Sequence, residues 1–174
     1  RLKSNGSVQA PVAFITCNSS PATKTSPAFF THYDVETLFH EFGHGLQHML
    51  TKVDYAGISG ISGVEWDAVE LPSQFMENWC WEKDVLDTFA FHFETNQKLP
   101  NKLFKKLLAT KNYNTGMALL RQIEFSLFDF LLHMNEEKKK AKLTERVLQN
   151  VRKETSLLAV HKNNKFQNSF AHIF

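Results

Sequence analysis

Two histidines spaced four residues apart could hold a metal ion. His40 and His44 lie in TLFHEFGHGLQHML (residues 37–50), and Glu41 directly follows the first of them. On a helix, residues i and i+4 share one face, so both imidazoles can reach one zinc ion at about 2.0–2.1 Å. A glutamate placed after the first histidine can act as general base toward a water at that ion. The spacing therefore predicts a metal site that carries its own base.

A metal-free surface helix is the alternative interpretation. The HExxH pattern arises by chance in about one chain of this size in a hundred. In a helix expected over residues 33–53, His40, His44 and Glu41 lie about 140°, 180° and 240° from the centre of the apolar stripe. All three are therefore opposite the apolar face, a position that fits both a metal site and a plain solvent-facing surface.

Two glycines favour the metal site. Gly43 and Gly45 lie inside the expected helix, where each costs about 1 kcal/mol relative to alanine. Glycine is found at such positions where something approaches the backbone closely. A substrate or a packed element over the histidines would explain them.

The third ligand is expected to come from another element. His48 lies about 12 Å along the helix axis from His40, at about 1.5 Å per residue, so one ion cannot bind both. The metzincin pattern would place glycine at position 47 and histidine at position 50, whereas this chain has Gln47 and Leu50. We therefore expect a carboxylate to complete the site.

A second helix offers two such carboxylates. It is expected to begin at Asp67 and to run through AVELPSQFMENWCWE, which places Glu70 and Glu77 on one face. Glu70 is a candidate ligand, or it closes a capping box with Asp67. Glu77 is a candidate partner that orients a ligand histidine, or an ordinary surface charge. Pro72 limits the helix and favours an irregular first turn, which would present Glu70 well.

The surrounding elements are expected to be mostly helical. Residues 11–17 (PVAFITC) and 27–30 (PAFF) are rich in β-formers and predict a short pair of strands. Thr31 and Asp34 fit a capping box at the start of the first helix, and a glycine-rich loop is expected over 54–66. Further helices are expected at 83–95, 101–111 and 115–134, with a charged, solvated helix at 135–154.

Composition limits the class of protein. A chain of 174 residues with 43% hydrophobic residues is large enough for one domain with a core. Its net charge of +2 gives no case for a nucleic-acid partner. Cys17 and Cys80 lack CxxC spacing, which favours a reducing compartment such as the cytoplasm. No apolar run approaches the roughly 18–20 residues of a membrane helix, and RLKSNGSVQAP has no signal-peptide core.

Both ends of the sequence suggest a fragment of a longer protein. The first residue is not methionine, and the last residues form the apolar run FAHIF (170–174).

The sequence also resembles a known family. TLFHEFGHGLQHML followed by SGISGVEWDAVELPSQFMENWCWE is similar to the zinc site of the oligopeptidase A and thimet oligopeptidase family, and most of all to its bacterial oligopeptidase A branch. These proteins are gluzincin metallopeptidases, helical and clam-like, which cleave short peptides in a deep channel. The similarity covers most of residues 11–134 and returns at 166–174.

This resemblance implies the roles of individual residues. His40, His44 and Glu70 are expected to bind one zinc ion, and Glu41 is expected to be the general base. His172, in FAHIF, is similar to a family histidine that helps to bind substrate or to stabilise the transition state.

The expected fold is mainly α, a fragment of a helical zincin-type metallopeptidase catalytic domain. One region is expected over 1–174, with a strand-containing edge at 1–30, the zinc-site helices at 31–134, and a charged helix with the C-terminal segment at 135–174. The expected function is zinc-dependent hydrolysis of internal bonds of short peptides in the cytoplasm. The alternative function is a truncated, catalytically incompetent zinc-binding module. The choice of metal also stays open, because manganese or cobalt can occupy a site of two histidines and one carboxylate.

Overall fold

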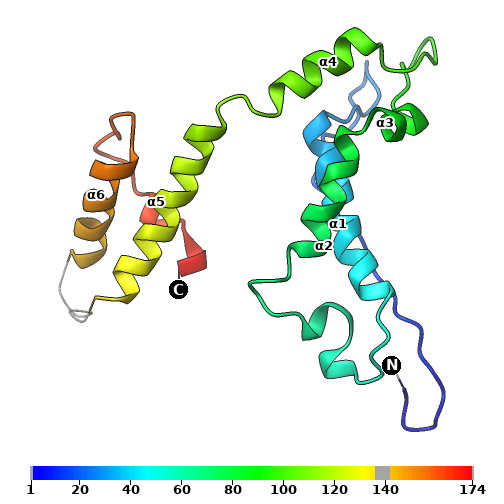
Figure 1. Cartoon of the computed structure of the whole chain (residues 1–174), viewed down its shortest axis with the longest axis horizontal. Helices are drawn as coiled ribbons and strands as arrows, with labels where there is room; N and C mark the ends of the chain where they lie inside the picture. The colour runs from blue at the N-terminus through cyan, green and yellow to red at the C-terminus, as the bar shows by residue number, and fades with distance from the viewer. Residues whose placement is uncertain (1, 136–141, 174) are drawn as a thin grey trace. The chain divides into compact units, whose positions relative to one another are not determined.

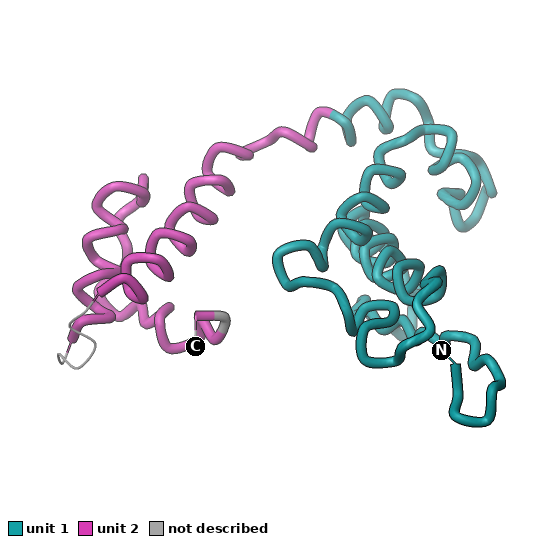
Figure 2. Tube along the Cα trace, turned by 60° about the horizontal axis from the view of Figure 1, so that its bottom comes forward, with its two compact units in different colours: residues 1–108 teal, residues 109–174 magenta. Residues whose placement is uncertain are grey.

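The chain is mainly helical and divides into two compact units. The computed structural model describes residues 2–135 and 142–173 (Figure 1). The first unit is Arg1–Leu108 and the second is Ala109–Phe174 (Figure 2). Within the described ranges, no helix has both the length and the apolar character needed to cross a membrane. The mainly α expectation is confirmed.

The first unit is built around one long helix. Its elements are α1 (His32–Met49), the 3-10 turns η1 (Ala56–Ile58) and η2 (Gly60–Gly63), α2 (Leu71–Glu77), the 3-10 turn η3 (Asn78–Trp81), α3 (Lys83–Phe89) and the start of α4 (Asn101–Thr110). Helices α1 and α2 lie side by side (Figure 1).

Helix α1 begins as predicted and ends early. The Asp34 N–H bonds the Thr31 hydroxyl at 3.2 Å, and the Asp34 carboxylate accepts the Thr31 backbone N–H at 2.7 Å, which completes the capping box. The helix ends at Met49 and not near residue 53. The Thr51 hydroxyl accepts the N–H groups of Val53 and Gly60, so this residue serves the following loop and does not extend the helix.

Helix α2 begins one turn later than predicted. Residues 66–70 form turns, in which the Leu71 N–H bonds the Ala68 carbonyl at 3.1 Å. Glu70 is the N-cap residue, and Pro72 lies in the first turn of the helix. A proline has no N–H to donate and disfavours a helical residue before it, which explains the late start. The predicted irregular turn before Pro72 is confirmed.

The predicted pair of strands is wrong. In the described residues, 2–135 and 142–173, the only β pairings are two isolated bridges, Leu2 with Val8 and Phe91 with Lys98. Residues 11–17 instead pack along α1, with Ile15 and Ala13 beside Gly45. Branched and aromatic residues suit any extended, half-buried segment, so their presence does not require a ladder of hydrogen bonds.

The helix expected at 83–95 is shorter than predicted. Helix α3 ends at Phe89, and Ala90 leaves the helical region with φ −86° and ψ 81°. Asn96 then adopts a left-handed conformation with φ 55°. This turn brings Phe91 back against Lys98, which closes the segment as a small loop.

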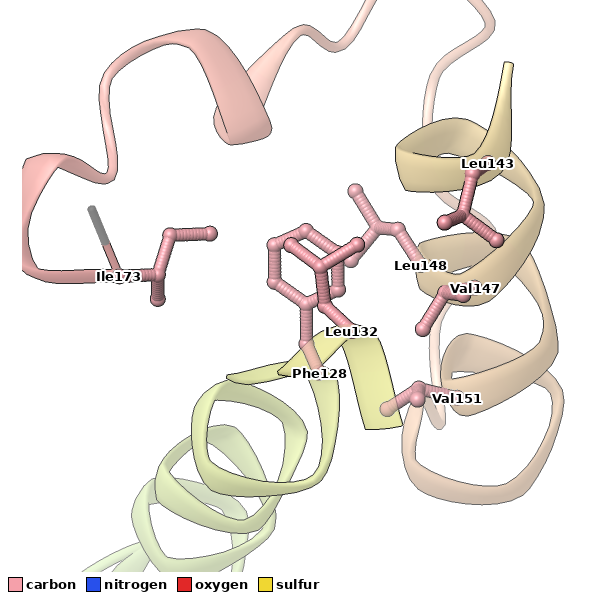
Figure 3. Close-up of a cluster of buried hydrophobic side chains, with 7 residues drawn as sticks. All are labelled: Phe128, Leu132, Leu143, Val147, Leu148, Val151 and Ile173. Atoms are coloured by element: carbon pink, nitrogen blue, oxygen red, sulfur yellow. The ribbon is translucent and has the colours of Figure 1, made fainter. Parts of the chain in front are cut away.

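The second unit holds a cluster of buried apolar residues. Helices α5 (Thr115–His133) and α6 (Leu143–Thr155) are followed by the 3-10 turns η4 (Phe166–Asn168) and η5 (Ala171–Ile173). Figure 3 shows the cluster between them: Phe128, Leu132, Leu143, Val147, Leu148, Val151 and Ile173. The solvated helix expected at 135–154 is therefore wrong for one face of α6, and residues 136–141 lie outside the described ranges.

A buried carboxylate ties the C-terminal segment to this unit. Glu124 is 4% exposed, and its Oε1 accepts hydrogen bonds from Arg152 at 2.8 Å and forms an ion pair with Arg121 at 2.8 Å. Arg152 also donates to the Asn164 side chain at 3.0 Å, and both arginines lie against the Phe166 ring. The segment that leads to η5 is held by these contacts.

Candidate metal centre

Three side chains from two elements converge in the first unit. His40 and His44 come from α1, and Glu70 precedes α2. The Glu70 Oε2 atom lies 3.1 Å from Nε2 of His40 and 3.2 Å from Nε2 of His44. One ligand atom from each residue lies within 4.8 Å of the others. The structure thus brings together the three residues that the sequence analysis selected as ligands.

The spacing and chemistry of these donors fit a zinc ion. Around a tetrahedral zinc with ligands at about 2.0–2.1 Å, neighbouring ligand atoms are about 3.3 Å apart. The two nitrogen–oxygen separations in this site, 3.1 and 3.2 Å, are close to that distance. Two imidazole nitrogens and one carboxylate oxygen also form the donor set of catalytic zinc sites that retain an open position. The donor set and both nitrogen–oxygen separations therefore fit a zinc ion, and the two histidine nitrogens lie within 4.8 Å of each other.

Glu77 contacts the first histidine. Its Oε1 lies 2.6 Å from Nδ1 of His40, on the opposite side of the ring from Glu70. A carboxylate on Nδ1 favours the tautomer that keeps its proton there, so the Nε2 lone pair of a neutral ring faces Glu70. Of the two roles considered for Glu77, this geometry matches the orienting partner. In contrast, the buried Nδ1 of His44 has no hydrogen-bond partner among residues 2–135 and 142–173.

Gly43 explains how the two helices come so close. A Cβ atom at this position would lie 2.5 Å from the Pro72 carbonyl oxygen and 2.5 Å from the Ser73 Cα. Both are atoms of the α2 backbone, which cannot rotate away. The predicted close approach is confirmed here. At Gly45 a Cβ would meet the Ile15 side chain at 3.6 Å, an ordinary contact, so the same prediction is wrong for that glycine.

Glu70 is held as an anion although it is half exposed. Its side chain is 50% exposed, and the Ser73 hydroxyl donates to its Oε2 at 2.7 Å. That hydrogen bond is the main cause that lowers the pKa of Glu70 below its ordinary value, while nearby His44 and His40 lower it further and desolvation opposes them. A metal ligand must be deprotonated, so the environment favours the binding form. The alternative role of Glu70, a capping box with Asp67, is not seen. In the described part of the chain, no side chain caps the N-terminus of α2.

The predicted base lies beside the cluster and outside it. An open cleft of about 390 Å³ is lined by Tyr33, Glu36, Thr37, His40, Glu41 and Glu77. Glu41 is half-buried and faces this cleft together with His40. The Glu41 carboxylate is therefore accessible from the cleft, and Glu41 is not one of the three candidate metal ligands.

The two other histidines of interest lie elsewhere. His48 is also part of α1, but its ring packs against Gly60 and not against the candidate ligands. It fills the space that a side chain at Gly60, which has φ +62°, would need. This agrees with the expectation that His48 and His40 do not share an ion. His172 belongs to η5 in the second unit, and its side chain lies outside the described residues. Its role stays a prediction.

We expect replacement of Glu77 by alanine to lower zinc affinity by about 10–100-fold. The physical reason is that His40 loses the carboxylate that holds its Nδ1 proton and its ring orientation. Competition against a chromophoric chelator measures the change. Replacement of Glu82, an exposed glutamate in the next loop, is the control and should leave the affinity unchanged. An equal affinity for the two variants would contradict the orienting role.

One residue at this centre was not singled out from the sequence. Ser73 donates to the same Glu70 oxygen that faces both histidines. A serine three residues after a glutamate at the start of a helix is common, and no spacing rule separates this one from a simple capping residue. Only the packing against Gly43 places its hydroxyl at the ligand.

Comparison with known proteins decides the family. The family model described as Peptidase family M3 matches residues 1–174. The chain belongs to peptidase family M3. This M3 chain is 51% identical over 173 residues to oligopeptidase A of Escherichia coli, an alignment that covers 99% of the chain and 25% of that protein. It is 45% identical over 168 residues to the probable cytosolic oligopeptidase A of Arabidopsis thaliana, covering 97% of the chain and 24% of that protein.

A third relative carries the second name in the predicted family. The thimet-like oligopeptidase of Dictyostelium discoideum is 46% identical over 133 residues, covering 75% of the chain and 20% of that protein. The predicted resemblance to the oligopeptidase A and thimet oligopeptidase family is therefore confirmed. The chain spans about a quarter of the length of the curated bacterial relatives that it matches.

Proposed function

We propose that this chain carries the catalytic zinc centre of a metallo-oligopeptidase that hydrolyses internal bonds of short peptides. One observation carries the proposal, the convergence of His40, His44 and Glu70 beside the Glu41 cleft. Membership of a peptidase family supports it, as do relatives named oligopeptidase A. The matching relative named cytosolic and the absence of disulfide spacing support a cytoplasmic location.

The two histidines and Glu70 would hold the ion through Nε2, Nε2 and Oε2. When bound there, zinc supplies Lewis acidity, which polarises a peptide carbonyl and lowers the pKa of water. Glu77 keeps the His40 ring in the orientation that directs Nε2 toward the ion. The Ser73 hydroxyl helps to keep Glu70 ionised.

Glu41 would act on the proton of the attacking water. From its position in the cleft it accepts that proton as the water oxygen adds to the scissile carbonyl carbon. It then delivers the proton to the nitrogen of the departing amine as the C–N bond breaks. The carboxylate ends the cycle as it began, so the net reaction is hydrolysis of one peptide bond. His172 is proposed to assist substrate or transition-state binding in the intact protein.

A zinc-binding module without hydrolytic activity is the second candidate. The observation that favours it is the length of the chain, which spans about a quarter of the length of its bacterial relatives. Selectivity for short peptides would depend on parts of a longer protein.

Metal removal tests the proposed function. A quenched-fluorescence peptide of about ten residues is incubated with the chain before chelation, after chelation and after zinc is restored. We expect hydrolysis to disappear with the chelator and to return with one equivalent of zinc, because the ion supplies the Lewis acidity. Zinc binding without hydrolysis would favour the module. Hydrolysis that survives complete metal removal would contradict both candidates.

A further inference from the structure

The crossing of α1 and α2 encloses a polar side chain that contacts a candidate ligand and does not itself react. Ser73 is 0% exposed, the only side chain of the α2 helix buried to this degree. Its Cα lies against Gly43, and a Cβ atom added to Gly43 would be only 2.5 Å from the Ser73 Cα. Water therefore has no room to reach this hydroxyl, and its hydrogen bonds must be made within the protein.

The hydroxyl has one proton to donate, and both acceptors within its reach belong to a single residue. Its Oγ lies 2.7 Å from Oε2 of Glu70 and 2.9 Å from the Glu70 carbonyl oxygen. A bond to the carbonyl is the local contact that any serine in a first helical turn can make. The bond to Oε2 is different, because Oε2 is the atom that lies 3.1 and 3.2 Å from the two histidine nitrogens.

Glu70 needs such an anchor. Its side chain is 50% exposed, so water would otherwise leave its torsions free to sample several rotamers. A carboxylate oxygen has two lone-pair directions. A donor on one direction holds the group in place and leaves the other direction open toward a cation. A hydrogen-bonded ligand carboxylate is a common feature of well-formed metal sites.

We propose that Ser73 is a positioning residue for the metal, which fixes Oε2 of Glu70 at the third ligand position through its buried hydroxyl. The proposal rests on the proposed function, since it requires Glu70 to be a ligand. It predicts that the hydroxyl contributes to metal affinity and to ligand geometry, and that this contribution acts only through Glu70.

The test compares two buried serines. Ser73→Ala removes the donor to Glu70, and Ser59→Ala is the matched control, because Ser59 is 9% exposed and bonds the Thr51 hydroxyl at 3.2 Å away from the ligands. Zinc affinity is measured by chelator competition, and ligand geometry by the visible absorption of bound Co²⁺. We expect Ser73→Ala to weaken zinc binding by about 10–100-fold and to change the cobalt spectrum. The control should match the wild type in both.

A double-mutant cycle separates positioning from packing. In a Glu70→Ala background, Ser73→Ala should leave the residual affinity unchanged, because the oxygen on which it acts is gone. If Ser73→Ala proves unstable, Ser73→Cys keeps nearly the same side-chain size and replaces the hydroxyl with a weak S–H donor, and a loss of affinity is again expected. An affinity within twofold of the Ser59→Ala control, or an equal loss in the Glu70→Ala background, would overturn the proposal. Failure of the wild type to bind zinc would instead overturn the proposed function.

Discussion

Replacement of Glu41 by glutamine is expected to lower peptide hydrolysis by roughly two to four orders of magnitude and to leave zinc content unchanged. Glutamine keeps the size of the side chain and its place in the cleft, but an amide cannot accept a proton from water. Glu41 is not among the three residues whose ligand atoms converge, so zinc binding should persist. The measurement pairs initial rates on a quenched peptide with zinc content by mass spectrometry.

Glu36 provides a matched control for that substitution. It lines the same cleft on the same helix, and its Oε1 accepts the Trp81 indole N–H at 3.1 Å. Glu36→Gln removes the same charge and retains an oxygen that can accept this bond. Its rate should stay within a few-fold of the wild type. Equal rates for the two variants, or loss of zinc from Glu41→Gln, would show that Glu41 is not the base.

Gly43→Ala is expected to separate α1 from α2. The added Cβ would meet two backbone atoms of α2 at 2.5 Å, so the helices must move apart. Overpacking of this kind costs about 1–3 kcal/mol in the free energy of unfolding, more than the gain of about 1 kcal/mol from removing a helical glycine. Zinc affinity should fall too, because Glu70 lies two residues before Pro72 and depends on this contact.

Gly45→Ala is the control for helix propensity. It makes the same chemical change two residues away, where the nearest atom is an Ile15 side-chain carbon at 3.6 Å. This variant should be as stable as the wild type, or more stable by up to about 1 kcal/mol. Urea unfolding followed by tryptophan fluorescence reports on the first unit alone, since the chain's three tryptophans are Trp66, Trp79 and Trp81. Equal midpoints for the two variants would contradict the close-approach explanation.

The first helix and its histidines could be predicted from local pattern. The capping box of Thr31 and Asp34 marks where α1 begins, and the i, i+4 spacing puts both imidazoles on one face. The end of the helix could not be predicted, because it depends on the bond from Gly60 to the Thr51 hydroxyl, nine residues apart. Local propensity contains no information about such a contact.

The sequence limited the third ligand to a few carboxylates, but it could not show how those carboxylates are oriented toward the histidines. Glu70 and Glu77 were recognised as two carboxylates on one face, with more than one role open to each. Only the tertiary structure shows that Glu77 meets Nδ1 of His40 while Glu70 meets both Nε2 atoms. Ser73 was missed for the same reason, since its importance comes from burial against Gly43.

The errors arose where a local pattern has more than one structural solution. Residues 11–17 have strand-like composition, yet they pack on α1 without a ladder. Helix α6 has charged residues near both of its ends, and its apolar residues repeat at helical spacing, so Leu148 and Val151 are buried in the second unit. Charge content predicted solvation, whereas the periodicity of the few apolar residues determined the packing.

The zinc content of purified wild type, His44→Ala and His48→Ala tests the central claim most directly. His44 contributes an Nε2 atom to the cluster, whereas His48, one turn further along α1, packs against Gly60. After dialysis against buffer that contains trace zinc and no other divalent metal, mass spectrometry should find one equivalent of zinc in the wild type and in His48→Ala. It should find less than about a tenth of that in His44→Ala, which retains only two of the three protein ligands that a catalytic zinc site uses. A wild type without zinc, or equal zinc in all three proteins, would contradict the assignment of the metal centre.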